Sequence, residues 1–238
     1  MILLAFEGTR RVWRRPWGVG LWTEQLYQLG VRSLTLANVT LLFTGMVLAV
    51  QTGYSLSAYG GQAFVGDIVA LSVVRELGPV LTALMVAGRV GAGITAELGS
   101  MVVTEQVDAL RALGTDPIKR LVVPRVGALI IALPCLTVLA ITAALFGALL
   151  MAMFDVGQGR QYFLDHVFGA LTVNDVVSGV GKSVFFAWFI GIIACHNGLN
   201  VRGGADGVGR ATTETVVTSC LAVIVSDFFL TKLFLEVL

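Results

Sequence analysis

Four charged residues lie within otherwise apolar stretches of the sequence and could do chemistry there: Arg75, Glu76, Lys182 and Asp227. A single ionised side chain at mid-membrane costs at least about 2.5–3.5 kcal/mol. If these stretches cross a bilayer, the two cations and two anions are therefore expected to pair with one another. Such a network either only fixes the register of the helices, or it borders a polar spot on a transport path.

Two glycine-rich strings resemble nucleotide-binding motifs but lack their context. GVGKS at 179–183 ends like a P-loop, yet the first glycine of that motif would fall on Val176, and no strand is predicted before it. GAGITA at 91–96 fits a dinucleotide-binding spacing, again without a preceding strand. We expect these glycines to allow close packing of helices, and we expect the chain itself to hydrolyse no ATP.

The sequence offers no convincing catalytic or metal-binding cluster. Its three cysteines are isolated in apolar segments without C-x-x-C spacing, and His166 and His196 have no acidic or cysteine partner at ligand spacing. No Ser–His or Cys–His arrangement suited to an intramembrane hydrolase is evident. The sequence therefore predicts no metal site, no directly bound cofactor and no enzymatic activity. A net charge of +1, without a basic patch, gives no indication of a nucleic-acid partner.

The composition places most of the chain in a membrane. Of its 238 residues, 56% are hydrophobic and only 13% are charged, and the mean hydropathy is +0.87. Soluble domains contain about 25% charged residues. Residues 33–66 and 126–154 contain no Asp, Glu, Lys or Arg, and each run exceeds the roughly 20 residues that a membrane helix needs. Two such runs make a buried helix of a soluble protein the weaker explanation.

The predicted fold is an all-α integral membrane protein. Residues 1–31 mix arginines with tryptophans, as in RRVWRRPWGVGLWTEQL, which is typical of an amphipathic helix lying in the membrane surface; a frayed basic tail is the alternative. Residues 32–238 form the transmembrane domain. Its five predicted segments lie at roughly 33–56, 68–95, 125–153, 176–198 and 213–236.

The basic residues of the short loops predict the orientation of these segments. With the N-terminus in the cytoplasm, most loop arginines and lysines lie inside, whereas the outer connection 154–175 carries Asp155, Asp165 and Asp175. The C-terminus is then periplasmic. At about 1.5 Å of rise per residue, the four buried charges lie at a similar depth, about 9–12 Å below the outer surface. Arg89 and Glu97 reach the inner boundary, where Arg89 can extend to the interface.

The connection between the second and third segments is shaped to bind a partner. In TEQVDALRALGTDPIKRLVVPR, residues 104–125, one face of a short helix is expected to carry Val107, Leu110, Leu113 and Gly114. Gly114 can end that helix, and Pro117 prevents its continuation. An amphipathic helix between two membrane helices can insert into a groove on another protein. We expect this cytoplasmic element at about 104–116.

The same connection resembles the EAA loop of ABC-transporter permeases. Asp108, Ala109 and Leu110 match its acidic-small-apolar triplet, followed by Gly114 and Pro124. Leu110 stands where the family pattern has alanine, which weakens the case for close backbone approach to the partner there. The resemblance implies that the ATPase-coupling helix includes Glu105, Asp108, Ala109, Leu110, Arg111 and Gly114.

A longer resemblance covers roughly residues 24–236. The pieces RELGP, GRVGAGITAELG and TEQ occur in order, as in the signature region of the MlaE (YrbE) permease family, and RATTETVVTSCLAVIVSDFFLTKLF is similar to the last helix of that family. The resemblance implies a phospholipid-transporting ABC system of the bacterial inner membrane. Its expected partners are a second permease copy, a cytoplasmic ATPase dimer that binds ATP and Mg, and a periplasmic ring of MCE-domain proteins. Some members also have a STAS-domain partner.

Phospholipid transport would require a cavity with apolar walls and a few polar groups. We expect Leu48, Gln51, Tyr54, Glu76 and Leu77 to line it at the dimer interface, although ordinary helix-packing roles are the alternative. Two other functions stay open. An ion-coupled carrier or channel would use the four buried charges as a proton relay, but no inverted repeat is evident. A membrane scaffold without transport would tolerate neutralising those charges.

Overall fold

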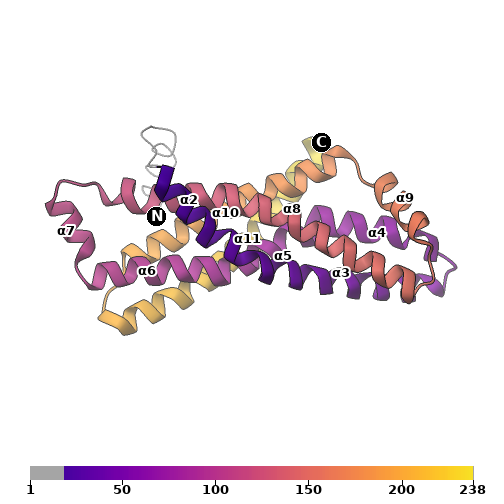
Figure 1. Cartoon of the computed structure of the whole chain (residues 1–238), viewed down its shortest axis with the longest axis horizontal. Coiled ribbons are helices and arrows are strands. Elements are labelled where there is room, and N and C mark those ends of the chain that lie inside the picture. Colours follow the sequence, from indigo (N-terminus) through magenta and orange to yellow (C-terminus); the bar gives the residue numbers. More distant parts are fainter. Residues whose placement is uncertain (1–18, 238) are drawn as a thin grey trace. The chain divides into compact units, whose positions relative to one another are not determined.

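The computed structural model describes residues 19–237, and within them the side chains of residues 19–22, 235 and 237 are left aside. Over this range every regular element is a helix, which confirms the predicted all-α fold (Figure 1). The α-helices are α2 (Val19–Leu29), α3 (Leu34–Ser57), α4 (Val65–Ser72), α5 (Gly78–Val86), α6 (Ala92–Val103), α7 (Gln106–Ala112), α8 (Val123–Phe154), α9 (Arg160–Ala170), α10 (Val173–Leu199) and α11 (Gly204–Val237).

Short 3₁₀ and π-helical turns join several of these α-helices, so that the helical path of the backbone continues from one to the next. The 3₁₀ turns are η1 (Val31–Ser33) and η2 (Gln62–Phe64), and the π-helical turns are η3 (Val73–Leu77), η4 (Ala87–Gly91) and η5 (Ile118–Val122). Five continuous helical stretches are long and apolar enough to cross a membrane: Thr23–Ser57, Gln62–Val103, Ile118–Phe154, Val173–Leu199 and Gly204–Phe234. They correspond to the five predicted segments, but most are longer than expected because polar turns at their ends remain helical.

The predicted surface helix at 1–31 is only partly within the described range. Residues 1–18 lie outside it, and α2 covers part of the remainder. Helix α2 leads through η1 into α3, and Arg89 on η4 donates to the buried hydroxyl of Ser33 over 2.6 Å. The guanidinium of Arg89 therefore holds the entry to the first long helix.

The chain divides into two compact units, which are described separately. The first unit contains the residues up to Ser33, Ala83–Leu133 and Val184–Phe228, and the second contains Leu34–Thr82, Pro134–Ser183 and Phe229–Leu238. Helices α8, α10 and α11 each contribute residues to both units.

Close packing of α3 against α8 forms the centre of the second unit. Small residues recur every four positions on both helices, among them Gly45 and Ala49 on α3 and Ala144 and Ala148 on α8. A side chain at Gly45 would collide with the backbone carbonyl of Ala144. Without a difference in hydrophobicity between lipid and protein, such small-residue faces let helix backbones approach and gain van der Waals contact.

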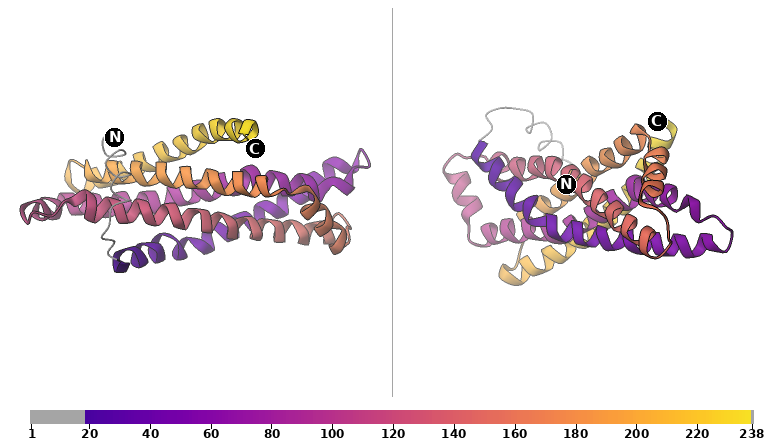
Figure 2. Two further views of the ribbon diagram at one scale, coloured as in Figure 1. Left: turned by 90° about the horizontal axis from the view of Figure 1, so that it is seen from above. Right: turned by 45° about the vertical axis from the view of Figure 1, so that its right-hand side comes forward.

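A short helix that the sequence analysis did not anticipate covers part of the second unit. Helix α9, within the predicted outer connection, packs against α4, as Figures 1 and 2 both show. Its Phe163 and Val167 are buried, and Gly66 on α4 leaves room for the His166 side chain and the Phe163 carbonyl. His166 Nδ1 lies 3.0 Å from a carboxylate oxygen of Asp67. This pair ties α9 to α4.

Buried hydroxyl and amide groups join the helices of the first unit. The hydroxyl of Thr95 on α6 lies 3.0 Å from the carbonyl of Ala194 on α10 and 2.9 Å from the hydroxyl of Thr215 on α11. Asn197 donates to the same Thr215 hydroxyl over 3.0 Å. Buried Arg125 on α8 pairs with Glu97 in the middle of α6 at 3.0 Å. These bonds satisfy polar groups that lipid could not hydrate.

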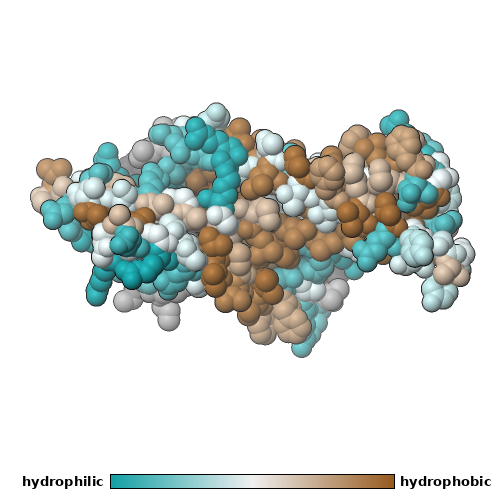
Figure 3. Space-filling view, turned by 90° about the horizontal axis from the view of Figure 1, so that it is seen from below, coloured by the Kyte–Doolittle hydropathy of each residue, from teal (hydrophilic) through white to brown (hydrophobic). Residues whose placement is uncertain are grey.

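Large apolar side chains are exposed along whole helix faces. On α3 the exposed row includes Phe43 and Val47, and on α11 it includes Val217, Leu221 and Phe228. The space-filling view in Figure 3 shows apolar residues gathered in broad patches rather than scattered singly. Exposed apolar surface of this extent marks contact with a membrane or another protein.

Candidate functional site

The candidate site begins at an irregular turn in the helix that carries Arg75 and Glu76. In the π-helical turn η3 the amide of Gly78 donates to the carbonyl of Val73, five residues earlier. Pro79 has no N–H, so it cannot donate to the Arg75 carbonyl four residues before it, as an ordinary residue in an α-helix would. The RELGP sequence thus leaves the Arg75 carbonyl, within a membrane-spanning helix, without its usual α-helical donor.

Lys182 on α10 supplies that donor. Its ammonium group lies 3.1 Å from the Arg75 carbonyl, 2.8 Å from Glu76 Oε1 and 2.6 Å from the hydroxyl of Thr231 on α11. An ammonium carries three N–H donors, and three acceptors surround this one. The Thr231 hydroxyl in turn donates to Glu76 Oε1 over 3.1 Å. The Lys182 side chain is only 2% exposed, and these bonds compensate for its removal from water.

The close approach of α10 explains how Lys182 reaches the turn. A side chain at Gly179 would collide with the carbonyl of Val74, and the ring of Pro79 lies beside the same position. Gly179 is the first glycine of the GVGKS string, so its role in this structure is to bring two helix backbones together. The string lies inside α10, and no strand occurs among residues 19–237. It is therefore not a P-loop.

Arg75 points to a second carboxylate, that of Asp175 at the start of α10. Its Nε and one terminal nitrogen both lie 2.6 Å from Asp175 Oδ1. The other oxygen of Asp175 accepts from the amide and the hydroxyl of Thr172, each over 2.8 Å. The Asp175 carboxylate thus accepts from the Thr172 amide at the N-terminus of α10, which is one half of a capping box, while the Asp175 amide donates to the Thr172 carbonyl over 3.1 Å. Arg75 is 42% exposed along its side chain, whereas Asp175 is 6% exposed.

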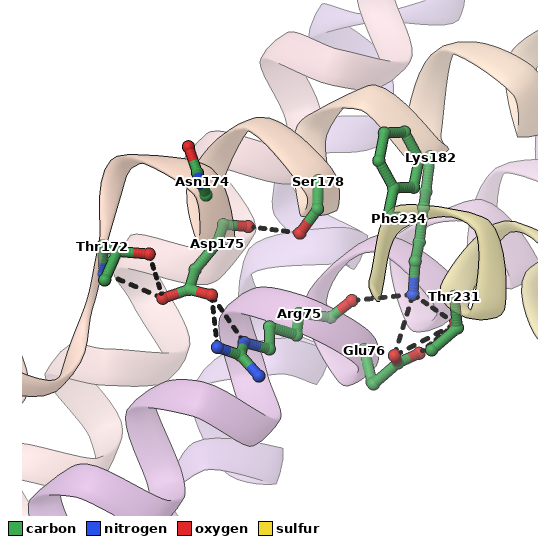
Figure 4. Close-up of a pocket in the computed structure, with 9 residues that line it drawn as sticks. All are labelled: Arg75, Glu76, Thr172, Asn174, Asp175, Ser178, Lys182, Thr231 and Phe234. Carbon is green, nitrogen blue, oxygen red and sulfur yellow. Dashed lines mark hydrogen bonds and ion pairs between the residues drawn. The ribbon is translucent and has the colours of Figure 1, made fainter. Parts of the chain in front are cut away.

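These charged groups border a cavity of about 300 Å³ within the second unit (Figure 4). Figure 4 shows the Lys182, Glu76 and Thr231 cluster on one side and the Arg75, Asp175 and Thr172 cluster on the other. Phe234, Ser178 and Asn174 complete the lining. Each N–H donor of the Lys182 ammonium has an acceptor. The side chains of Arg75 and Glu76, in contrast, are partly exposed. A polar group entering the cavity would therefore meet one guanidinium edge and one carboxylate.

Sequence reasoning missed Asp175 and Thr231 as members of this site. Asp175 belonged to the predicted outer connection, although the pattern Thr172-x-x-Asp175 is the signature of a helix N-terminus and could have placed it on α10. A single threonine in a membrane helix gives no comparable signal, so Thr231 could be found only from the structure.

The remaining predicted residues fall into separate groups. Of the five residues expected to line a lipid cavity, Glu76 lines the cavity described above. Leu48 packs on the core of the second unit, and Leu77 is half-buried. Gln51 and Tyr54 lie on the exposed part of α3, with Tyr54 84% exposed. Asp227 lies in the first unit on α11, and its place in the charge network stays a prediction.

The helix predicted within about 104–116 is present as α7, in the first unit, and its role in coupling to an ATPase stays a prediction. Asp108 and Arg111 form an exposed ion pair at 2.7 Å, Val107 is buried, and Ala109 is exposed. Just after the helix, Leu113 is 79% exposed, an arrangement suited to insertion into another protein.

Both ends of α7 turn through left-handed backbone. Glu105 precedes the helix with φ of 60°, and Gly114 follows it with φ of 71°. Glu105 is the sole residue other than glycine with positive φ in the described range. Left-handed backbone is strained for a side-chain-bearing residue, so this sharp entry to α7 is held by the surrounding structure.

Comparison with known proteins now identifies the family. The sequence matches the family described as "Permease MlaE" over residues 22–233. The chain belongs to the MlaE permease family. It is 42% identical over 235 residues to a protein of Rickettsia felis named as a probable ABC transporter permease, covering 99% of this chain and 91% of that protein. A permease subunit of this kind is a multi-pass membrane protein and is generally non-catalytic.

Relatives outside Rickettsia extend the comparison. A probable ABC transporter permease protein of Synechocystis is 43% identical over 213 residues, covering 90% of this chain and 81% of that protein. The chloroplastic protein TRIGALACTOSYLDIACYLGLYCEROL 1 of Arabidopsis thaliana is 38% identical over 213 residues, covering 90% of this chain and 61% of that protein. The resemblance read from RELGP and the following motifs is therefore confirmed at the level of the family.

Proposed function

We propose that this MlaE permease moves phospholipid between the bacterial inner membrane and a periplasmic MCE-domain partner. The supporting observation is the cavity of about 300 Å³ whose partly accessible Arg75 and Glu76 lie within helices that are otherwise apolar. A phospholipid needs this combination, because its headgroup carries charge and its acyl chains require an apolar wall. The name of the Arabidopsis relative refers to a glycerolipid, in keeping with this substrate class.

A second copy of the chain would complete the apolar wall. Val47, Gln51 and Tyr54 lie on one exposed face of α3, spaced so that they follow one another along the helix. Two such faces brought together in a homodimer would enclose a space lined by these residues, with Leu48 and Leu77 beside it. The dimer interface is therefore the proposed path for the acyl chains.

Energy would enter from a separate ATPase dimer in the cytoplasm, with ATP and Mg bound there. The exposed Leu113 and the ion-paired surface of α7 would insert into a groove on that ATPase. Motion of α7 would reach the membrane through its continuous neighbours, α6 before it and η5 with α8 after it. This assignment places the N-terminus in the cytoplasm and the C-terminus in the periplasm. A STAS-domain protein on the ATPase is a further proposed partner.

Copurification tests the proposal directly. The tagged full chain, extracted in mild detergent, should bring down an ABC ATPase, an MCE-domain protein and glycerophospholipid, each identified by mass spectrometry. A chain that instead moves substrate in liposomes by itself, driven by a proton gradient and without nucleotide, would establish the ion-coupled carrier.

A matched pair of variants tests the docking surface. Leu113→Glu should weaken ATPase association more than about tenfold, because a residue inserted at the centre of an interface contributes about 2 kcal/mol or more where it is a hot spot, and the variant also brings an unpaired charge into the groove. Val31→Glu places the same charge on an exposed apolar position outside the loop, 51% exposed, and should leave association unchanged. Equal effects of the two variants would contradict docking through α7.

A further inference from the structure

The turn between α10 and α11 in the first unit builds a second polar cavity. Gly203 and Gly204 have φ of 92° and 68°, which lie in the left-handed region that favours glycine. A side chain at Gly207 would collide with the carbonyl of Arg202. The chain therefore reverses tightly, and the first turn of α11 packs directly on the backbone of Arg202.

This reversal brings two arginines and one glutamate to the same cavity of about 450 Å³. Arg202 comes from the turn, whereas Arg210 and Glu214 come from successive turns of α11. The Arg210 guanidinium folds back over the turn, with one nitrogen 3.3 Å from the position that a Cβ of Gly203 would occupy. His196 on α10 and Asn200 directly after that helix form another wall.

The wall groups are fixed, whereas the charged groups are available. Asn200 donates to the His196 carbonyl over 2.7 Å. Among the residues whose side chains the structure describes, neither Arg202 nor Arg210 forms an ion pair, and Glu214 has no cationic partner within 4 Å. Arg75, Arg111 and Arg125 by contrast each have a carboxylate partner. Within the described part of the chain, the cavity thus presents two arginines and one glutamate that take part in no ion pair.

The cavity also lies where a lipid headgroup is found. One candidate membrane span ends at Leu199 and the next begins at Gly204, so the turn between them is at the membrane surface. Val201 beside the cavity is buried and packs toward Gly99 on α6, close to the end of that helix before α7. The cavity is therefore at the same end of the first unit as the proposed coupling helix, the end that the proposed orientation places in the cytoplasm.

We propose that this cavity binds the headgroup of an amine-bearing glycerophospholipid from the adjacent leaflet. Arg202 and Arg210 receive the phosphate, for which the guanidinium fork is well matched, and Glu214 receives the ammonium. Basic pockets between membrane helices on the cytoplasmic side are known to bind lipid headgroups. The glutamate sets this cavity apart from a purely basic one, because it can pair with the ammonium of an amine-bearing headgroup, whereas an anionic headgroup without an amine offers it no cation. The inference rests on the membrane location of the chain and not on lipid transport.

Photocrosslinking of the full-length wild-type protein tests the site without any variant. The probe is a phosphatidylethanolamine whose acyl chain carries a diazirine near the glycerol, added to the protein in phosphatidylcholine nanodiscs. Peptide mass spectrometry should find the probe within residues 196–214. Unlabelled phosphatidylethanolamine should compete at lower concentration than phosphatidylglycerol. Soluble glycerophosphoethanolamine should compete much more weakly than the lipid.

Variants then assign the two halves of the headgroup. Arg202→Gln and Arg210→Gln should each raise the competing concentration of phosphatidylethanolamine about fivefold, the effect of one basic residue near a membrane surface. Glu214→Gln should remove the preference for phosphatidylethanolamine over phosphatidylglycerol. Arg120→Gln is the matched control, since Arg120 does not line this cavity, and it should behave as wild type.

Several outcomes would overturn the proposal. Crosslinks outside 196–214, equal competition by the two lipids in the wild-type protein, or equal effects of Arg210→Gln and Arg120→Gln would each do so. Competition by glycerophosphoethanolamine as strong as that of the lipid would replace a lipid site with one for a soluble phosphate. Lipid transport that fails while the 196–214 crosslink persists would refute the proposed function and leave this site standing.

Discussion

Replacing Pro79 by alanine should affect stability differently depending on whether Lys182 is present. In the wild-type chain the Arg75 carbonyl accepts from the Lys182 ammonium over 3.1 Å, because Pro79 offers no N–H. Pro79→Ala introduces an N–H at residue 79, but the Arg75 carbonyl already accepts from Lys182 and gains little from it. The substitution also removes part of a buried ring. Loss of about two methylene groups at about 0.8 kcal/mol each predicts a destabilisation of about 1.5 kcal/mol.

In a chain that already carries Lys182→Met, the N–H that Pro79→Ala introduces has a different effect on the free energy of unfolding. Removing the ammonium leaves the Arg75 carbonyl without its donor, and it leaves Glu76 with the Thr231 hydroxyl as a donor but without its cation. Glu76 is 38% exposed, so part of its charge stays hydrated. We therefore expect Lys182→Met to cost about 1–3 kcal/mol, below the 3–5 kcal/mol typical of a fully buried pair. In this background the alanine amide satisfies the orphan carbonyl, a gain of about 1 kcal/mol.

A double-mutant cycle measures this coupling. The four chains are unfolded reversibly in mixed micelles by titration with sodium dodecyl sulfate and followed by far-ultraviolet circular dichroism. The double variant should be more stable, by about 1 kcal/mol, than the sum of the two single effects predicts. Pro134→Ala is the control, since it removes another proline inside a helix, α8, that is not among the partners of Lys182. Additivity of Pro79→Ala and Lys182→Met within about 0.3–0.5 kcal/mol would refute the role of Lys182 as the missing donor.

Three further substitutions test other contacts by the same unfolding measurement. Asp175→Ala should cost about 2–3 kcal/mol, because it removes a charged partner and a helix cap together, whereas Asp155→Ala at an exposed position should stay within about 0.5 kcal/mol. Gly45→Val should cost about 3 kcal/mol or more, since its side chain would meet the backbone of α8; Gly88→Val, in open space, should have a much smaller effect. Thr95→Val should lose about 0.6–1.7 kcal/mol, the range for hydrogen bonds between membrane helices, and a loss near zero would show that its bonds to α10 and α11 contribute nothing.

The helical fold and the family were predictable because they depend on local or linear properties of the sequence. Apolar runs longer than a bilayer is thick predicted the number of long helices, and RELGP with the motifs after it indicated the MlaE permeases. The ends of the helices were less well predicted, since polar residues such as Asp67 and Asp206 extend α4 and α11 beyond the apolar runs. Helix α9 was missed because its hydrophobicity is modest and only its packing on α4 stabilises it.

The candidate site was predictable only in part. A charge in an apolar segment needs a partner, and on that ground the sequence indicated a network that includes Arg75, Glu76 and Lys182. Which carboxylate or carbonyl each charged side chain contacts depends on how closely the helix backbones approach one another. Gly179 lets α10 approach η3 until the Lys182 ammonium reaches a carbonyl, and Asp175 meets Arg75 for the same reason.

The sequence by itself determined that this chain is a membrane-embedded bundle of helices of the MlaE permease family, because hydropathy and motif order depend only on the order of the residues along the chain. The tertiary structure decided which polar groups meet. The pairing of Arg75 with Asp175, the three acceptors around Lys182, and the two arginines at the α10–α11 turn join residues separated along the chain or turned back on one another. Such contacts depend on backbone distances of a few ångströms, which small residues permit and which no linear pattern specifies.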